Sequence, residues 1–122
     1  MTVANTFYNG PSLSLAAGTY FVSGTITVTA PTQVKIEQRV TAKFYNGTTT
    51  WASSESETSP ATSNFNAVTT ISLHAIITVG TLTTVYFGAA ALQASSIIVA
   101  TVPDNGTNAT NTASGMVALK IA

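Results

Sequence analysis

The strongest constraint on the fold is an alternation of apolar and hydroxyl side chains with a period of two residues. It is clearest in Gly18–Val28, where one face carries the apolar residues Tyr20, Val22, Ile26 and Val28. This is the period of a β-strand, and no segment shows the 3.6-residue apolar stripe of an amphipathic helix. Thr and Ser supply 35 of the 122 residues, while Glu, Lys, Arg and Gln are scarce. This composition suits a pleated sheet, so we expect an all-β fold.

Turn-forming residues divide the chain into about eight expected strands. These lie near Val3–Tyr8, Gly18–Val28, Val34–Tyr45, Trp51–Ser56, Ala67–Val79, Thr83–Ala91, Ser96–Val102 and Gly115–Ile121. Asn46-Gly47 is the strongest hairpin signal, and a two-residue turn there would place Trp51 opposite Ala42. The pattern predicts one antiparallel sandwich, jelly roll or barrel over residues 1–122, with the polar segment Met1–Pro11 as a candidate docking arm.

Two neighbouring strands are apolar on both faces. If Ala67–Val79 and Thr83–Ala91 form a hairpin at Gly80-Thr81, one face carries Leu73, Ala75, Ile77 and Tyr86. The opposite face then carries His74, Ile76, Val85 and Phe87. In an antiparallel sheet two apolar faces mean that both are covered, one by the core and the other by a partner.

Charged residues make up only 7% of the chain, and four basic residues balance four acidic ones. This composition excludes a nucleic-acid binder that works by neutralising phosphates. Half of the charges, Lys35, Glu37, Arg39 and Lys43, fall on one face of a single expected strand. A net charge of zero favours association, so we expect much of the surface to be covered by copies of the chain.

Few residues could carry out catalysis or bind a metal. A Ser–His–Asp site would need His74 and Asp104, but no nucleophile elbow is present. Glu55 and Glu57 lie two residues apart rather than across a cleft, and Asp104 with Asn105 and Asn108 offers calcium only one carboxylate. The chain has no Cys. We therefore expect no enzyme, cofactor or metal site.

No segment predicts a membrane partner. Met1–Gly10 is polar and lacks the pattern of a secretory signal. The longest unbroken apolar runs are a few residues long, far short of the roughly 20 that cross a bilayer. Three Asn-x-Thr sequences match the glycosylation pattern, which a Thr-rich chain produces by chance.

Four segments resemble small β-sandwich domains of tailed-phage structural proteins: GTYFVSGTITV (18–28), KFYNGTTTWASSE (43–55), ISLHAIITVGTLTTVYFGAAA (71–91) and ASGMVALKIA (113–122). The similarity covers nearly the whole chain. More distantly, the order of motifs is similar to the trimeric jelly roll of tumour necrosis factor and the complement globular heads. The chain departs from that distant family at Val22 and Thr81.

The resemblance implies an antiparallel jelly-roll β-sandwich that assembles as a homotrimer through one sheet. The expected trimer interface consists of Phe21, His74, Ile76, Val85 and Phe87. Residues expected to contact the capsid or a ligand are Phe7, Tyr8, Tyr45, Trp51 and Asp104.

Three functions follow as hypotheses. The first is a capsid decoration or cement protein on the exterior of a phage virion, docked on the major capsid or tail protein. The second is a tail-fibre or head-spike adhesin that binds host surface glycans through the Trp51 hairpin and the loop Pro103–Ala113. The third, a hydrolase or lyase, would require His74 and an acid to converge in a cleft.

Overall fold

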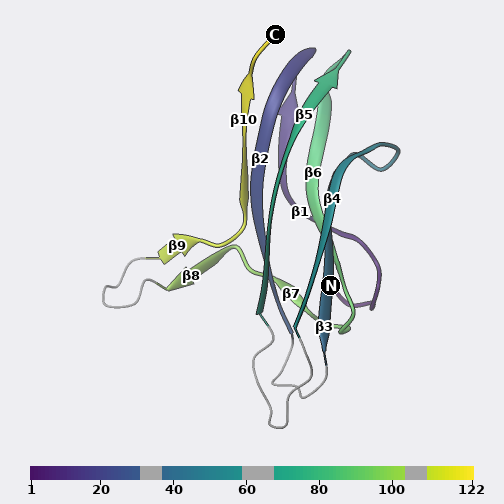
Figure 1. The fold of residues 1–122 in the computed structure, drawn as a ribbon, viewed down its shortest axis with the longest axis vertical. Coiled ribbons are helices and arrows are strands. Elements are labelled where there is room, and N and C mark those ends of the chain that lie inside the picture. Colours follow the sequence, from purple (N-terminus) through teal and green to yellow (C-terminus); the bar gives the residue numbers. More distant parts are fainter. Residues whose placement is uncertain (31–36, 59–67, 104–109) are drawn as a thin grey trace.

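The computed structural model describes residues 1–30, 37–58, 68–103 and 110–122, and all their regular structure is β (Figure 1). No helix in this part of the chain is long and apolar enough to cross a membrane. The all-β prediction is confirmed. The strands are β1 (Tyr8–Leu15), β2 (Gly18–Thr29), β3 (Gln38–Tyr45), β4 (Thr50–Thr58), β5 (Val68–Val79), β6 (Thr83–Ala91), β7 (Ile97–Ile98), β8 (Thr101–Pro103), β9 (Thr110–Thr112) and β10 (Gly115–Lys120).

The strands form two antiparallel sheets that face each other. One sheet has the order β1-β6-β3-β4 and the other β10-β2-β5, with β7 paired to the end of β2. β4 runs beside β5 at one margin, and β1 approaches β10 at the other (Figure 1). β8 and β9 form a separate two-stranded hairpin that points away from the sheets. The arrangement is that of a β-sandwich.

The core lies between the two sheets. Phe44 of β3 and Phe87 of β6 are fully buried, and their rings meet edge to face with centroids 4.7 Å apart. The opposite sheet contributes the apolar face expected for Gly18–Val28, namely Tyr20, Val22, Ile26 and Val28, all buried. The period-two pattern therefore predicted the inward face of β2 correctly.

The first strand starts later than expected. Tyr8–Leu15 forms β1, and Asn9-Gly10-Pro11 is not a turn between elements but lies within this strand, where the register with β6 shifts. A Cβ atom on Gly10 would lie 2.6 Å from the Phe87 carbonyl oxygen, so the close approach of the strands requires glycine. Met1 packs against the core, and its amino group donates a hydrogen bond to the Ser96 carbonyl at 2.8 Å. The candidate arm is folded against the body.

The hairpin between β3 and β4 is present, but its loop is longer than two residues. The Asn46 N–H donates to the Thr49 carbonyl at 3.1 Å, and the Asn46 side-chain oxygen accepts from the Thr48 and Thr49 N–H groups at 3.1 and 2.8 Å. This side-chain closure of the turn shifts the pairing, so Ala42 lies opposite Ser54 and not opposite Trp51.

Other boundaries differ locally. The strand expected at Ser96–Val102 is split into β7 and β8, and the loop expected at Pro103–Ala113 contains β9. Val34, Lys35 and Ile36 of the expected third strand lie outside the described residues.

Candidate self-association surface

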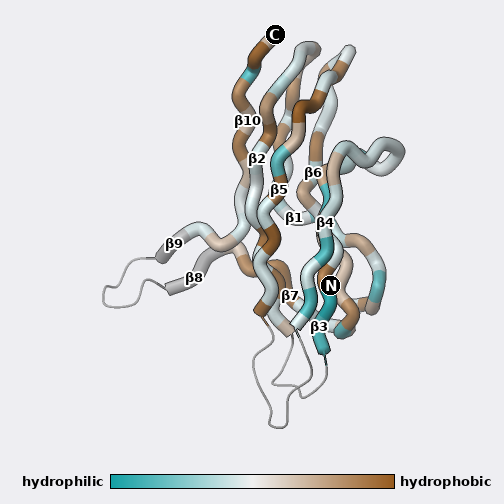
Figure 2. The backbone as a smooth tube through the Cα atoms, in the orientation of Figure 1, coloured by the Kyte–Doolittle hydropathy of each residue, from teal (hydrophilic) through white to brown (hydrophobic). Residues whose placement is uncertain are grey.

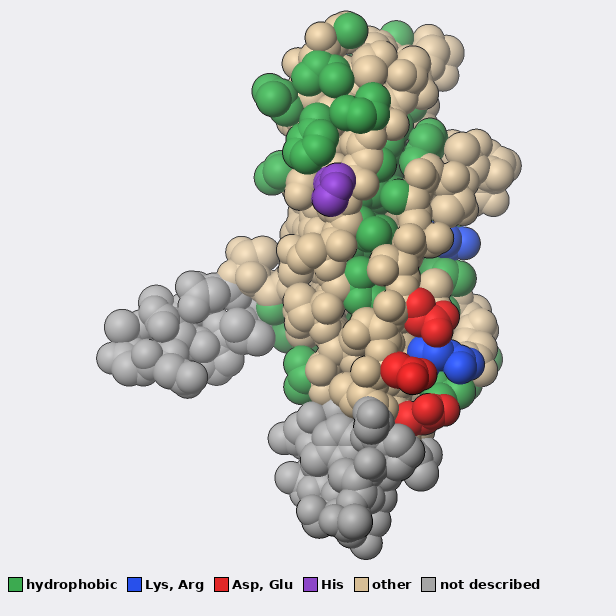
Figure 3. Space-filling model, in the orientation of Figure 1, with side chains coloured by type: hydrophobic (Ala, Val, Ile, Leu, Met, Phe, Trp, Pro, Cys, Tyr) green, Lys and Arg blue, Asp and Glu red, His purple; other side chains and the backbone are tan. Residues whose placement is uncertain are grey.

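The outer face of the β10-β2-β5 sheet carries a group of exposed apolar side chains. Leu119 pairs with Phe21, which pairs with Ile76, so these three side chains form one row across the sheet. The next row contains Val117, Ser23 and His74. We name as the apolar strip the exposed residues Phe21, Ile76, Val117, Leu119 and Ile121. Figure 3 shows hydrophobic side chains clustered on this sheet beside the single histidine.

The strip is large for one side of a small domain. The exposed fractions range from 41% for Phe21 to 69% for Val117. For side chains of this size, these fractions leave about 500 Å² of apolar surface in contact with water. The largest patch on a typical monomer is about 300–600 Å² and is often functional, so the strip is at the upper end of that range.

The strip also lies on the uncharged sheet. β2 and β5 contain no Asp, Glu, Lys or Arg, and β10 contains only Lys120. Charged side chains gather instead on the other sheet, where Arg39 of β3 lies 3.8 Å from Glu55 of β4. Figure 2 shows the same division as hydrophilic residues along β3 and β4 and hydrophobic residues along β10. The two outer faces therefore differ in the partners that they can accept.

Three of the five expected interface residues lie together on this face. The Phe21 and His74 rings are nearly parallel, with an interplanar angle of 29° and centroids 6.1 Å apart, and Ile76 is 59% exposed. Whether they contact another copy stays a prediction.

The prediction that Val85 and Phe87 belong to the interface is wrong. Both are fully buried between the sheets and cannot reach another molecule. The prediction assumed that β5 and β6 form a hairpin, but the two strands belong to opposite sheets. The same face of β6 that was assigned to a partner therefore points into the core.

The sequence interpretation missed Val117, Leu119 and Ile121, which supply three of the five side chains in the strip. Their period-two spacing was visible. It did not identify an outer face, because the intervening Met116 and Ala118 are apolar as well.

Three residues expected to contact a capsid or ligand lie near the other sheet. The Lys43 ammonium group lies 3.8 Å from the Phe7 ring centroid and 4.5 Å from that of Tyr45. The Tyr45 hydroxyl donates a hydrogen bond to the Asn9 side-chain oxygen, and burial raises the pKa of Tyr45. A hydrogen bond with the Thr2 side chain lowers the pKa of Tyr8. Two of these three rings, Phe7 and Tyr45, therefore have partners within the chain: Lys43 lies over both, and Asn9 accepts a hydrogen bond from Tyr45.

The remaining two docking candidates do not join this group. Trp51 is partly buried and packs against the core, so it does not form a freely exposed aromatic platform at the β3–β4 hairpin. Asp104 lies outside the described residues. The proposed convergence of His74 with Asp104 therefore has no described geometry.

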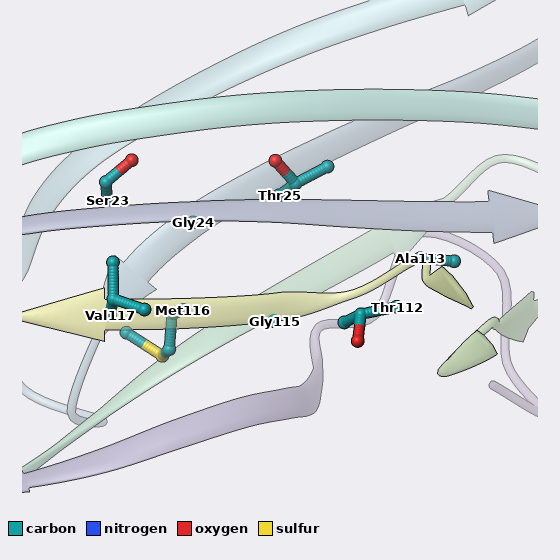
Figure 4. A pocket seen from close by; sticks show the side chains of 8 residues that line it. All are labelled: Ser23, Gly24, Thr25, Thr112, Ala113, Gly115, Met116 and Val117. Carbon is teal, nitrogen blue, oxygen red and sulfur yellow. The ribbon is translucent and has the colours of Figure 1, made fainter. Parts of the chain in front are cut away.

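An open groove of about 410 Å³ lies beside the strip at the start of β10 (Figure 4). It is lined by hydroxyl, small and apolar residues: Ser23, Gly24, Thr25, Thr112, Ala113, Gly115, Met116 and Val117. None of these carries a charge or a nucleophile paired with a base. Among the described residues no three His, Cys, Asp or Glu side chains are grouped to hold a metal.

Comparisons with known proteins gave no relative: no protein-family model, no curated protein and no solved structure matches the chain.

Proposed function

We propose that the protein is a structural component of a phage virion, a homotrimeric decoration protein that binds the outside of the shell and stabilises it. The observation that carries this proposal is the apolar strip on an uncharged outer sheet face. The resemblance of the four sequence segments to tailed-phage structural domains supplies the virion context.

The order of the strands supports a jelly-roll topology. Numbered along the chain, the eight strands of a jelly roll form sheets of order 1-8-3-6 and 2-7-4-5. With β7 and the β8–β9 hairpin set aside, the sheets β10-β2-β5 and β1-β6-β3-β4 correspond to 8-3-6 and 2-7-4-5. No described strand occupies position 1, beside β10. In the trimeric jelly rolls that the chain resembles, the inner sheet packs against its copies around a threefold axis, and we assign that role to the sheet that carries the strip.

The size and charge of the strip favour a copy of the same chain as its partner. A stable interface buries about 800 Å² on each side, and the roughly 500 Å² of the strip would form its apolar centre. Packing this face against other copies around a threefold axis brings no Asp, Glu, Lys or Arg of β2 or β5 into the interface. The unfavourable burial of an unpaired charge is thereby avoided.

The charged outer face of the other sheet would remain free in such a trimer. Lys43, Phe7 and Tyr45 lie there, and we assign them to the contact with the major capsid or tail protein. A trimer held this way adds contact area between shell subunits and so opposes internal pressure. It requires no cofactor and no catalysis.

Sedimentation velocity tests the self-association. At micromolar concentration the wild-type protein should sediment as a species of three times the 12.5 kDa chain. Leu119→Lys places a charge within the strip and should yield monomers. Leu82→Lys is the matched control, because Leu82 is even more exposed, at 75%, but lies outside the strip. A monomeric wild type, or equal effects of the two substitutions, would contradict the proposal.

A separate measurement tests the virion context. The chain should be detected by mass spectrometry in purified particles, and imaging of those particles should place it as threefold density on the outer surface. Its absence from the particles would refute the virion assignment even if the protein is a trimer.

A further inference from the structure

His74 is the one titratable residue in the two rows of the strip. It occupies the row of Val117 and Ser23, beside the row of Leu119, Phe21 and Ile76. Its side chain is exposed in the isolated chain. Any copy that covers the strip therefore also covers an imidazole ring.

Among the residues that the structure describes, the groups around His74 offer no compensating charge. Its neighbours on β5 are Ser72 and Ile76, and those on β2 are Phe21 and Ser23. Val117 follows on β10, whose only charge, Lys120, lies opposite the buried Tyr20 and so outside these rows.

The nearest acidic strand is β4, which runs beside the free margin of β5. It carries Glu55 and Glu57, which pair with Thr41 and Arg39 across the other sheet. Glu55 accepts a hydrogen bond from Thr41 and lies 3.8 Å from Arg39. The Glu55 carboxylate therefore has its partners on the outer face of the other sheet and not beside His74.

We propose that protonation of His74 controls self-association through the strip, so that the oligomer forms when the imidazole is neutral and dissociates when it is charged. This inference rests on the proposed function, because it assumes that the strip is an interface between copies. A neutral imidazole can be buried with a hydrogen-bonding partner such as a serine hydroxyl, whereas an imidazolium buried without a carboxylate is strongly disfavoured. The contact of His74 with the Phe21 ring is already present in the isolated chain, so it does not change the preference of the interface for neutral over charged imidazole.

The direction of the pH dependence follows from proton linkage. An interface that accepts only neutral histidine releases one proton per chain when it forms at low pH, which is three per trimer. Because three protons are released per trimer, the concentration at which half of the chains are assembled should rise by up to about thirtyfold for each unit by which the pH falls. The affinity between copies is highest where the imidazole is neutral and falls as the pH is lowered and the imidazole becomes charged.

Sedimentation velocity over a concentration series at pH 7.5, 6.5 and 5.5 tests the proposal on the full chain. For the wild type, the concentration at which half of the chains are assembled should rise as the pH falls. For His74→Gln, whose side chain stays neutral, this concentration should be the same at every pH. Glu55→Gln is the control for carboxylate titration and should keep the wild-type dependence. Circular dichroism at each pH establishes that the variants remain folded.

The outcomes separate the two proposals. A wild type that assembles at pH 7.5 with a midpoint independent of pH overturns the role of His74 and leaves self-association intact. The same holds if His74→Gln retains the full dependence, or if assembly strengthens at low pH. A wild type that is monomeric at every pH overturns both proposals.

Discussion

Replacing Gly24 with Ala is expected to destabilise the protein through one identifiable clash. Gly24 lies in the middle of β2, and a Cβ atom built there would be 2.7 Å from Cδ1 and 2.9 Å from Cε1 of Phe87. The carbonyl oxygen of Gly115 would lie at 3.0 Å. The Phe87 ring has little freedom to move, because it packs edge to face on Phe44 and is fully buried.

The magnitude follows from two opposing effects. Overpacking of a core by one methyl group costs about 1–3 kcal/mol. Alanine restricts the unfolded chain more than glycine does and returns about 0.5–1 kcal/mol. We expect Gly24→Ala to lower the free energy of unfolding by about 1–2 kcal/mol. Gly80→Ala is the matched control, since no atom of the described residues lies within 4 Å of its added carbon and its φ is not positive; it should leave stability unchanged or slightly raised.

Urea unfolding followed by the fluorescence of Trp51, at one fixed protein concentration, measures these differences. The substitution Phe87→Leu removes the ring, and the two δ-methyl groups of leucine can turn away from residue 24. The double variant should therefore be more stable than the sum of the single effects by at least about 1 kcal/mol. Additive effects, or a Gly24→Ala variant as stable as the Gly80→Ala control, would show that the contact with Phe87 is not what requires glycine.

Two further predictions concern single side chains. The buried hydroxyl of Thr69 has no hydrogen-bond partner among the described residues. The isosteric Thr69→Val should therefore raise the free energy of unfolding by about 1 kcal/mol in the same urea assay, and a loss of stability would mean that the hydroxyl is satisfied. Because burial raises the pKa of Tyr45 above 10.0 in the folded state, its contribution to stability is complete below pH 10.0 and is lost as the pH rises through the folded pKa. In a titration of tyrosinate absorbance, Tyr45→Phe should remove a late step and Tyr8→Phe an early one, since the pKa of Tyr8 is lowered; the reverse order would refute this assignment.

The local sequence predicted much of the strand content and several strand faces. β2, β5 and β6 lie within a residue of their expected bounds, and the inward face of β2 carries the predicted apolar residues. Each of these features depends on neighbours two residues apart along the chain, so a short window of sequence contains the information. The hairpin at Asn46-Gly47 was predictable for the same reason, while its loop length depended on hydrogen bonds made by the Asn46 side chain.

The sequence by itself thus determined that the chain is all-β, and that its uncharged strands bear more apolar side chains than one core can cover. Only the tertiary structure decided which of those side chains are covered. Alternation gives the period of a strand but not the direction in which either face points, and that direction depends on which distant strand lies alongside. The separation of β5 from β6 into opposite sheets turned Phe87 into the core, while the pairing of β10 with β2 and of β2 with β5 left Leu119, Phe21 and Ile76 side by side in water.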